Sequence, residues 1–108
     1  LDRRDDLVVT GGENVYPAEV EAALEAHPAV REAAVVGLPD PHWGQVVAAA
    51  VVPGDASAPG WSELEAWLRE RLAGYKVPRR WLALDELPRT ASGKLQRHLV
   101  RARFGSEP

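Results

Sequence analysis

The sequence contains no cysteine, which excludes a disulfide framework, a thiolate metal site and a cysteine nucleophile. Its longest apolar run, residues 46–52, is far too short to span a membrane, and no basic and apolar targeting segment opens the chain. The three histidines, His27, His42 and His98, are scattered without the spacing of metal ligands. We therefore expect a cytoplasmic protein with no membrane span and no metal site of its own.

Lysine is also scarce, and the net charge of -3 hides an uneven distribution. Residues 1–68 carry three basic and twelve acidic side chains (net -9), whereas residues 69–108 carry ten basic and four acidic ones (net +6). A basic half can hold nucleotide phosphates, although arginines on the wet faces of two helices would give the same pattern. A chain that is acidic overall lacks the electrostatic footprint of nucleic-acid binders, so we expect no nucleic-acid partner.

The length of 108 residues and the hydrophobic content of 45% suit one small domain with a real core. In its first half, residues 3–16 predict a small β-hairpin. A helix is expected to begin at Pro17, where the missing N–H costs nothing, and to end at Pro28. Residues 30–38 and 45–52 are rich in valine and alanine and predict two adjacent strands of a sheet that helices cover.

In the second half, Ser62 and Glu65 have the spacing of a capping box and predict the start of a helix that Gly74 ends. Residues 80–84 predict a third strand. A short final helix is expected to run out near Gly105, with three residues on its inward face: Leu95, Leu99 and Ala102. The fold class predicted is α+β, a small three-stranded sheet packed by helices, with an N-terminal β-hairpin and a C-terminal loop followed by a short helix.

Lys94 follows a run of small residues, Thr90-Ala91-Ser92-Gly93, immediately before the final helical pattern. Lysine is a compact point charge that can be directed at a phosphate or carboxylate oxygen, and this chain otherwise chooses arginine. The loop is not a phosphate-binding P-loop, because Pro88 stands where that motif needs glycine and Leu95 where it needs Ser or Thr. An isolated Gly-Lys pair is usually a solvated loop, so a functional interpretation depends on the rest of the chain.

Two further runs accompany this loop: residues 5–17 (DDLVVTGGENVYP) and residues 75–78 (YKVP). Together the three motifs closely resemble the C-terminal domain of AMP-forming acyl-CoA synthetases, a superfamily that includes nonribosomal-peptide adenylation domains and firefly luciferase. The resemblance covers residues 2–104, and the first motif looks most like ligases for aromatic or fatty acids, including o-succinylbenzoate ligases. It implies that residues 1–108 are a single domain, the mobile C-terminal part of a larger synthetase whose N-terminal domain is absent, and inactive alone.

The resemblance also implies a reaction in two steps. A carboxylic acid and ATP form an acyl-adenylate and pyrophosphate, and the thiol of coenzyme A then displaces AMP. Lys94 matches the family's lysine that bridges the carboxylate and the α-phosphate during adenylation. The small residues beside it would let the charge enter for one step and leave for the next. Mg²⁺ would arrive with ATP, and its ligands are expected in the missing domain.

In this family the small domain turns about a hinge, which the resemblance places at Asp5, with Arg3 near the ribose and the domain junction. The family usually has glycine where this chain has Asp2. After the turn, the glycine loop would line the passage for the pantetheine arm, although a tight β-turn needing positive φ would explain the same glycines without function. The residues implied in binding coenzyme A are Gly11, Gly12, Glu13, Trp43, Tyr75 and Lys76, with Arg79 and Arg80 as further contributors.

Two other interpretations stay open. One is an adenylation domain that loads a carrier protein instead of free coenzyme A. The other is a non-catalytic interaction module of the same fold. The expected partners of the leading interpretation are the protein's own N-terminal domain, a carboxylic acid, ATP and coenzyme A. No residue of an acid-binding pocket is expected in this part of the fold, so the sequence does not identify the acid.

Overall fold

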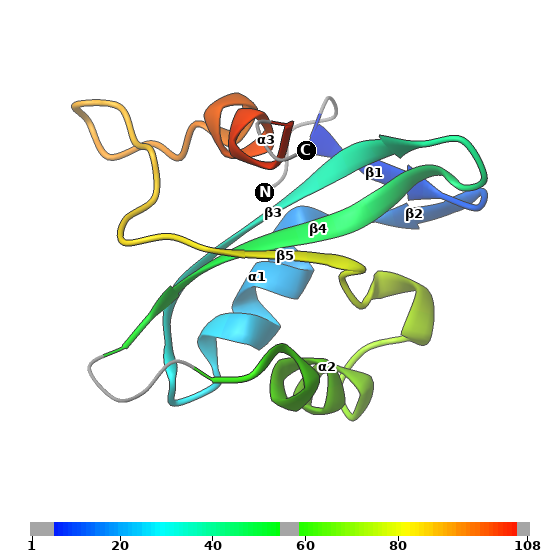
Figure 1. Ribbon diagram of the computed structural model, residues 1–108, viewed down its shortest axis with the longest axis horizontal. Coiled ribbons are helices and arrows are strands. Elements are labelled where there is room, and N and C mark those ends of the chain that lie inside the picture. The colour runs from blue at the N-terminus through cyan, green and yellow to red at the C-terminus, as the bar shows by residue number, and fades with distance from the viewer. Residues whose placement is uncertain (1–5, 55–58, 106–108) are drawn as a thin grey trace.

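The computed structural model describes residues 6–54 and 59–105 and has an α+β fold (Figure 1). These residues form a two-stranded hairpin, a three-stranded mixed sheet and three α-helices, as the sequence predicted. In chain order the elements are β1 (Val8–Thr10), β2 (Glu13–Val15), α1 (Pro17–Glu25), β3 (Val30–Asp40), β4 (Gly44–Pro53), α2 (Trp61–Arg69), the 3-10 turn η2 (Gly74–Lys76), β5 (Arg80–Ala83) and α3 (Arg97–Gly105).

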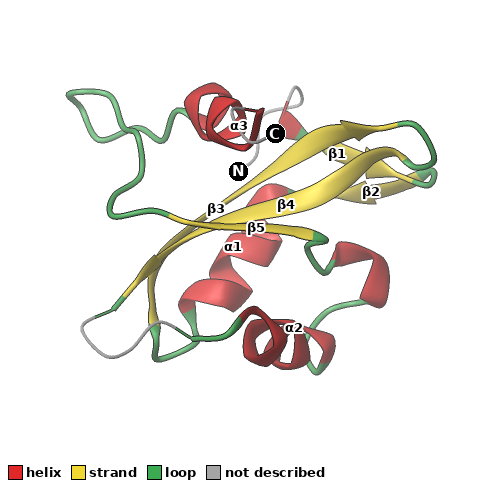
Figure 2. Ribbon diagram, in the orientation of Figure 1, coloured by secondary structure: helices red, strands yellow, loops and turns green. Residues whose placement is uncertain are grey.

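A long antiparallel hairpin, β3 with β4, is the base of the sheet. β5 pairs in parallel with β4, so the strand order is β3-β4-β5. Valine and alanine fill both faces of these strands, because α1 and α2 cover one face and α3 covers the other (Figure 2). Val35 and Val51 pack toward α1 and α2, whereas Val36 and Ala48 pack toward α3. The predicted pair of apolar strands under helices is confirmed.

The N-terminal hairpin and the start of α1 follow the prediction, whereas α1 ends at Glu25, before the predicted end at Pro28. β1 pairs antiparallel with β2, and residues 3–5 of the predicted hairpin lie outside the described residues. α1 begins at Pro17 and buries Val20 and Leu24 against the sheet. His27, just beyond its end, is buried and accepts a hydrogen bond at Nδ1 from the Ala29 N–H at 3.0 Å. Its burial at the end of the helix agrees with its predicted place in the helical stripe.

The predicted capping box of α2 is wrong. The helix begins one residue before Ser62, its N-cap is Gly60, and no side chain caps it. Tertiary packing sets this start, because the Trp61 ring stacks on the Trp81 ring of β5 at 5.3 Å between centroids. The Glu65 carboxylate instead accepts a hydrogen bond from the Trp81 indole. The predicted end is wrong too, because α2 stops at Arg69, before Gly74.

The inward face of α3 differs from the predicted one by a change of phase. Val100 and Phe104 are buried, whereas Leu99 is 41% exposed and Ala102 is exposed. Leu95 was expected to start the stripe, but it pairs with Arg89 in an isolated β-bridge before the helix begins. The stripe therefore starts at the first residue of the helix and combines two buried apolar residues, Val100 and Phe104, with two half-buried arginines, Arg97 and Arg101.

Candidate functional site

Lys94 follows a turn that hydrogen bonds close on itself. The Gly93 N–H donates to the Thr90 carbonyl at 2.9 Å, and the Thr90 N–H donates to the Lys94 carbonyl at 2.8 Å. The Thr90 hydroxyl accepts from the Lys94 N–H at 3.0 Å and contacts the Ser92 hydroxyl at 3.0 Å. Gly93 has φ of +92°, a conformation that glycine adopts without strain. The run of small residues before Lys94, residues 90–93, thus forms a defined turn.

Arg89 anchors the base of this turn. Its guanidinium donates to the Gly93 carbonyl at 3.0 Å and to the Glu32 carboxylate of β3 at 2.8 Å. Two β-type contacts complete the base, the Arg89–Leu95 bridge and a hydrogen bond from the Gln96 N–H to the Pro88 carbonyl at 3.0 Å. The side chain of Lys94 is exposed beyond this anchored base. One ammonium is therefore presented to the surroundings on a fixed support.

The second predicted site centres on the turn between β1 and β2. Gly11 and Gly12 have φ of +56° and +82°, the signs that a two-residue type I′ hairpin turn requires at both positions. The Gly11 N–H donates to the Trp43 carbonyl at 2.9 Å, and a Cβ on Gly11 would lie 2.9 Å from Cε3 of the Trp43 ring. A Cβ on Gly12 would meet no atom within 4 Å. Gly11 is thus packed on Trp43, while Gly12 leaves open backbone surface.

Trp43 belongs to the turn between β3 and β4, and several contacts hold it. The Asp40 carboxylate accepts hydrogen bonds from the backbone N–H groups of His42 and Trp43 at 3.0 and 2.8 Å. Trp43 is 37% exposed, and the Arg79 guanidinium lies 4.7 Å from the centroid of its ring. The structure therefore brings together Gly11, Trp43 and Arg79, which the resemblance implied in binding coenzyme A, Arg79 as a further contributor.

Tyr75, Lys76 and Glu13 are placed differently. Tyr75 and Lys76 lie in η2; Tyr75 is 42% exposed, whereas the Lys76 ammonium contacts the Glu19 carboxylate of α1 at 2.8 Å. This hydrogen bond, opposed by partial desolvation, raises the pKa of Lys76 above its ordinary value of 10.5. Lys76 is therefore charged and already paired at neutral pH. Glu13 begins β2 opposite Thr10 and is exposed.

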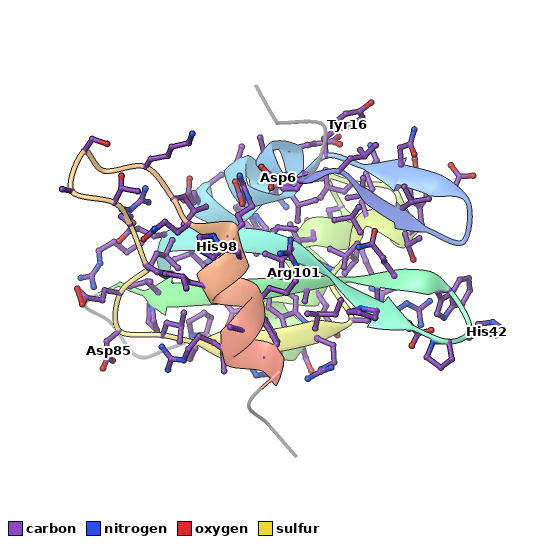
Figure 3. The ribbon with its side chains drawn as sticks, turned by 90° about the horizontal axis from the view of Figure 1, so that it is seen from above. Asp6, Tyr16, His42, Asp85, His98 and Arg101 are labelled. Carbon is purple, nitrogen blue, oxygen red and sulfur yellow. The ribbon has the colours of Figure 1, made fainter. Side chains whose placement is uncertain are left out.

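The two sites lie at opposite ends of the longest dimension of the molecule, which measures 37 Å. In Figure 1 the loop that carries Lys94 projects at one end, and the turns that carry Gly11 and Trp43 project at the other. Figure 3 shows the same separation from above, with His42 marking the turn between β3 and β4. One ligand cannot contact both ends at once. The predicted hinge residues, Arg3 and Asp5, lie outside the described residues.

Sequence reasoning missed a charged cluster behind the Lys94 loop. The guanidinium of Arg97, the first residue of α3, contacts the carboxylates of Glu21 in α1 and Asp6 near the start of the chain. The spacing of Arg97 and Arg101 with Val100 and Phe104 was the one available signal that these arginines face the protein. Nothing in the sequence identified the carboxylates that would meet them.

Within residues 6–54 and 59–105, no group of three or more His, Asp or Glu side chains is placed to hold a metal ion. Over the same ranges, no helix has both the length and the apolar character needed to cross a bilayer.

Comparison with known proteins gives these sites a family context. The sequence matches the family described as AMP-binding enzyme C-terminal domain over residues 19–94. The chain belongs to this family. It is 54% identical over 105 residues to feruloyl-CoA synthase from Amycolatopsis sp, which is 97% of this chain and 21% of that protein. It is 58% identical over 98 residues to 2-succinylbenzoate–CoA ligase from Bacillus velezensis, which is 91% of this chain and 20% of that protein.

A solved structure extends the match to the whole AMP-binding C-terminal fold. The o-succinylbenzoate CoA synthetase from Bacillus subtilis, in complex with the acyl-adenylate intermediate OSB-AMP, aligns with a TM-score of 0.85 and 46% identity. The alignment covers 100% of this chain and 21% of that chain. The predicted resemblance is confirmed, and the chain spans about one fifth of the length of the relatives it matches.

Proposed function

We propose that this chain is the mobile C-terminal domain of an ATP-dependent, AMP-forming ligase that joins an aromatic carboxylic acid to coenzyme A. The observation that carries this proposal is the identity of 54% and 58% to two CoA ligases over nearly the whole chain. The names of both relatives denote acids with an aromatic ring, which favours this substrate class over fatty acids. The acid pocket and most of the ATP site belong to the N-terminal domain, the partner of this chain.

Lys94 acts in the first step. Adenylation brings together two anions, the carboxylate of the acid and the α-phosphate of ATP, whose repulsion opposes the attack. A positive charge between them stabilises the transition state, where negative charge is shared. The exposed ammonium of Lys94 on its anchored turn suits this role, because a fixed charge costs little reorganisation when the reaction occurs.

The construction of the Lys94 turn favours delivery by movement of the whole domain. Flexing the turn alone would break the hydrogen bonds that Thr90, Gly93 and Arg89 make within it. Rotation of the domain about a hinge at Asp5 would withdraw Lys94 without breaking them, and it would bring the opposite end to the active site. Hinges of this kind are one or a few residues that absorb large changes in φ and ψ.

The glycine turn acts in the second step. The backbone of Gly12 offers an unobstructed surface along which a thin pantetheine arm can pass, because no side chain projects there. Beside it, the Trp43 ring provides a flat surface for the adenine, and the guanidinium of Arg79 provides a partner for a phosphate. ATP supplies the adenylyl group and coenzyme A the thiol. Mg²⁺ would arrive with ATP, and its protein ligands are expected in the N-terminal domain.

The proposal is tested with the full-length protein that contains this chain, incubated with ATP, Mg²⁺ and a panel of aromatic and aliphatic acids. We expect AMP, pyrophosphate and an aryl-CoA thioester, formed fastest with aromatic acids and free coenzyme A. Acylation of a phosphopantetheinylated carrier protein, with none of free coenzyme A, would favour the carrier-loading alternative. Absence of acid-dependent pyrophosphate release across the panel would contradict the proposal and favour a non-catalytic module.

A further inference from the structure

A compact ionic cluster connects the start of the described chain with the beginning of α3. The Arg97 guanidinium donates to the Glu21 carboxylate from Nη2 at 2.7 and 2.9 Å and from Nε at 3.2 Å. From Nη1 it donates to the Asp6 carboxylate at 3.3 Å. Oε2 of Glu21 also accepts a hydrogen bond from the backbone N–H of Val35 in β3 at 2.8 Å. One arginine thus joins the N-terminal segment, α1 and α3 over β3.

Because these side chains are shielded from solvent, breaking their contacts costs more than breaking a surface ion pair. The side chains of Arg97, Asp6 and Glu21 are 16%, 17% and 12% exposed. An arginine that meets a carboxylate with two parallel N–H donors is held in one orientation as well as attracted. Removing one partner of such a shielded group leaves the other charge uncompensated. The cluster therefore fixes the geometry of its three segments.

The position of Arg97 in its own helix does not explain its presence. It is the first residue of α3, where the positive end of the helix dipole disfavours a cation. A residue chosen for helix stability alone would be acidic or a capping residue here. The contacts to Glu21 and Asp6 offset this unfavourable placement, which indicates that the connection between segments is the reason for the arginine.

The two ends of the connection are the regions that the proposed function requires to move together. Arg97 lies three residues after Lys94, and the Gln96 N–H closes the base of the Lys94 loop on the Pro88 carbonyl. Asp6 directly follows Asp5, the predicted hinge. We propose, on the basis of the proposed function, that Arg97 is a positioning residue that clamps the chain after the hinge to the base of the Lys94 loop. When the domain rotates at the hinge, the chain after the hinge and the base of the Lys94 loop then move as one rigid unit.

The opposite end of the molecule is held by other contacts. The β1–β2 hairpin is fixed by hydrogen bonds from the Val9 N–H to the Gln45 side chain and from the Gly11 N–H to the Trp43 carbonyl, both at 2.9 Å. Neither contact involves the cluster around Arg97. Loss of the clamp should therefore impair the adenylation step, which uses Lys94, more than the thioester step, which uses the hairpin.

The test measures both half-reactions in the full-length enzyme for Arg97→Gln, Asp6→Asn and the double variant. Arg101→Gln is the matched control, because Arg101, which is labelled in Figure 3, lies one turn further along α3 and is half-buried. Its guanidinium donates to the Gly37 carbonyl at 3.2 Å and does not contact the cluster. We expect Arg97→Gln and Asp6→Asn each to lower the kcat of pyrophosphate release about tenfold through misplacement of Lys94. The KM for the acid and the conversion of preformed acyl-adenylate should change less than about twofold.

The double variant provides the readout that a purely structural role would not give. Because Asp6→Asn acts only through its contact with Arg97, whereas Arg97→Gln also removes the contacts with Glu21, the double variant should lose no more than Arg97→Gln alone. Arg101→Gln should lower the melting temperature without changing the ratio of the two half-reactions. Additive losses in the double variant, equal losses in both half-reactions, or the same change of ratio in Arg101→Gln would each overturn the proposal.

Two variants keep the test decisive. If Arg97→Gln does not fold, Asp6→Asn, which keeps the shape of the side chain, carries the test alone against Arg101→Gln. Lys94→Ala separates this inference from the function on which it rests. If Lys94→Ala loses adenylation while Asp6→Asn keeps wild-type half-reactions, only the clamp is refuted. If Lys94→Ala retains full adenylation, the proposed function itself fails.

Discussion

The molecule has two turns that each contain a glycine at positive φ with open space around it: the turn before Lys94, with Gly93, and the turn between β1 and β2, with Gly12. They are supported in different ways. The Lys94 turn is closed by its own hydroxyl and backbone groups and joins the rest of the protein at its base, through Arg89 and Glu32. The glycine turn packs against Trp43 through Gly11, which also donates its N–H to the Trp43 carbonyl.

This difference matches the two kinds of chemistry proposed. A projecting turn with an anchored base presents a charged side chain, which suits the stabilisation of anions in a neighbouring site. A turn packed on an aromatic ring presents backbone and a flat surface, which suits the passage and binding of a long, thin ligand. Since the two turns are at opposite ends of a molecule 37 Å long, the same active site can use them only in succession.

The largest expected effect comes from removing the charge at the first end. Lys94→Ala in the full-length enzyme should lower the rate of acid-dependent pyrophosphate release by roughly 10²- to 10³-fold, because a preorganised charge at the transition state is lost. Preformed acyl-adenylate should still be converted to thioester at nearly the wild-type rate. Arg71→Ala removes another surface cation, one that stacks on Trp67, and serves as the control that should leave both rates unchanged. Equal loss of both half-reactions in Lys94→Ala would contradict the division between the two ends.

A smaller effect is expected at the second end. Trp43→Ala should raise the KM for coenzyme A about tenfold, since stacking of a base on an aromatic ring contributes on the order of 1–3 kcal/mol. Adenylation should be unchanged. Tyr16→Ala is the control, because Tyr16 is an exposed aromatic residue outside the Trp43 turn. An unchanged KM for coenzyme A in Trp43→Ala would remove this ring from the proposed nucleotide site.

The smallest effect concerns the Lys76–Glu19 pair. Because the pKa of Lys76 is raised in the folded state, its contribution to stability is fully present below pH 10.5 and is lost as the pH rises through the folded pKa. Lys76→Gln should therefore lower the free energy of unfolding by about 0.5 kcal/mol at neutral pH, and the difference from wild type should vanish well above pH 10.5. Urea unfolding at both pH values measures it. A difference that persists at high pH would show that packing, and not charge, is the cause.

Much of the fold was predictable because its signals are local. The apolar runs of β3 and β4 and the proline that begins α1 each determine an element without reference to distant residues. The prediction was wrong for the start of α2 and for the inward face of α3, where contacts between separate elements determine the structure. Trp61 stacks on Trp81 at the start of α2, and α3 buries Val100 and Phe104 among residues of β3 and β4, a face that its own sequence did not indicate.

The candidate site follows the same rule. Lys94, Gly11 and Gly12 belong to motifs that are contiguous in the sequence, so they could be named from it. The packing of Gly11 on Trp43 and the ion pair between Lys76 and Glu19 could not, because each joins separate elements. The pair of Asp6 and Arg97 spans 91 residues of sequence. Neither periodicity nor spacing carries information about such a contact.

The central claim, that each end of the domain serves one half-reaction, is tested most directly by a matched pair of glycine substitutions. Gly12 and Gly93 have φ of +82° and +92°, and a Cβ at either position would meet no atom within 4 Å, so leucine imposes a similar backbone strain at both. The measurement is the ratio of pyrophosphate release to thioester formation in the full-length enzyme. The account predicts that Gly12→Leu raises this ratio and Gly93→Leu lowers it. A shift of both ratios in the same direction would contradict it.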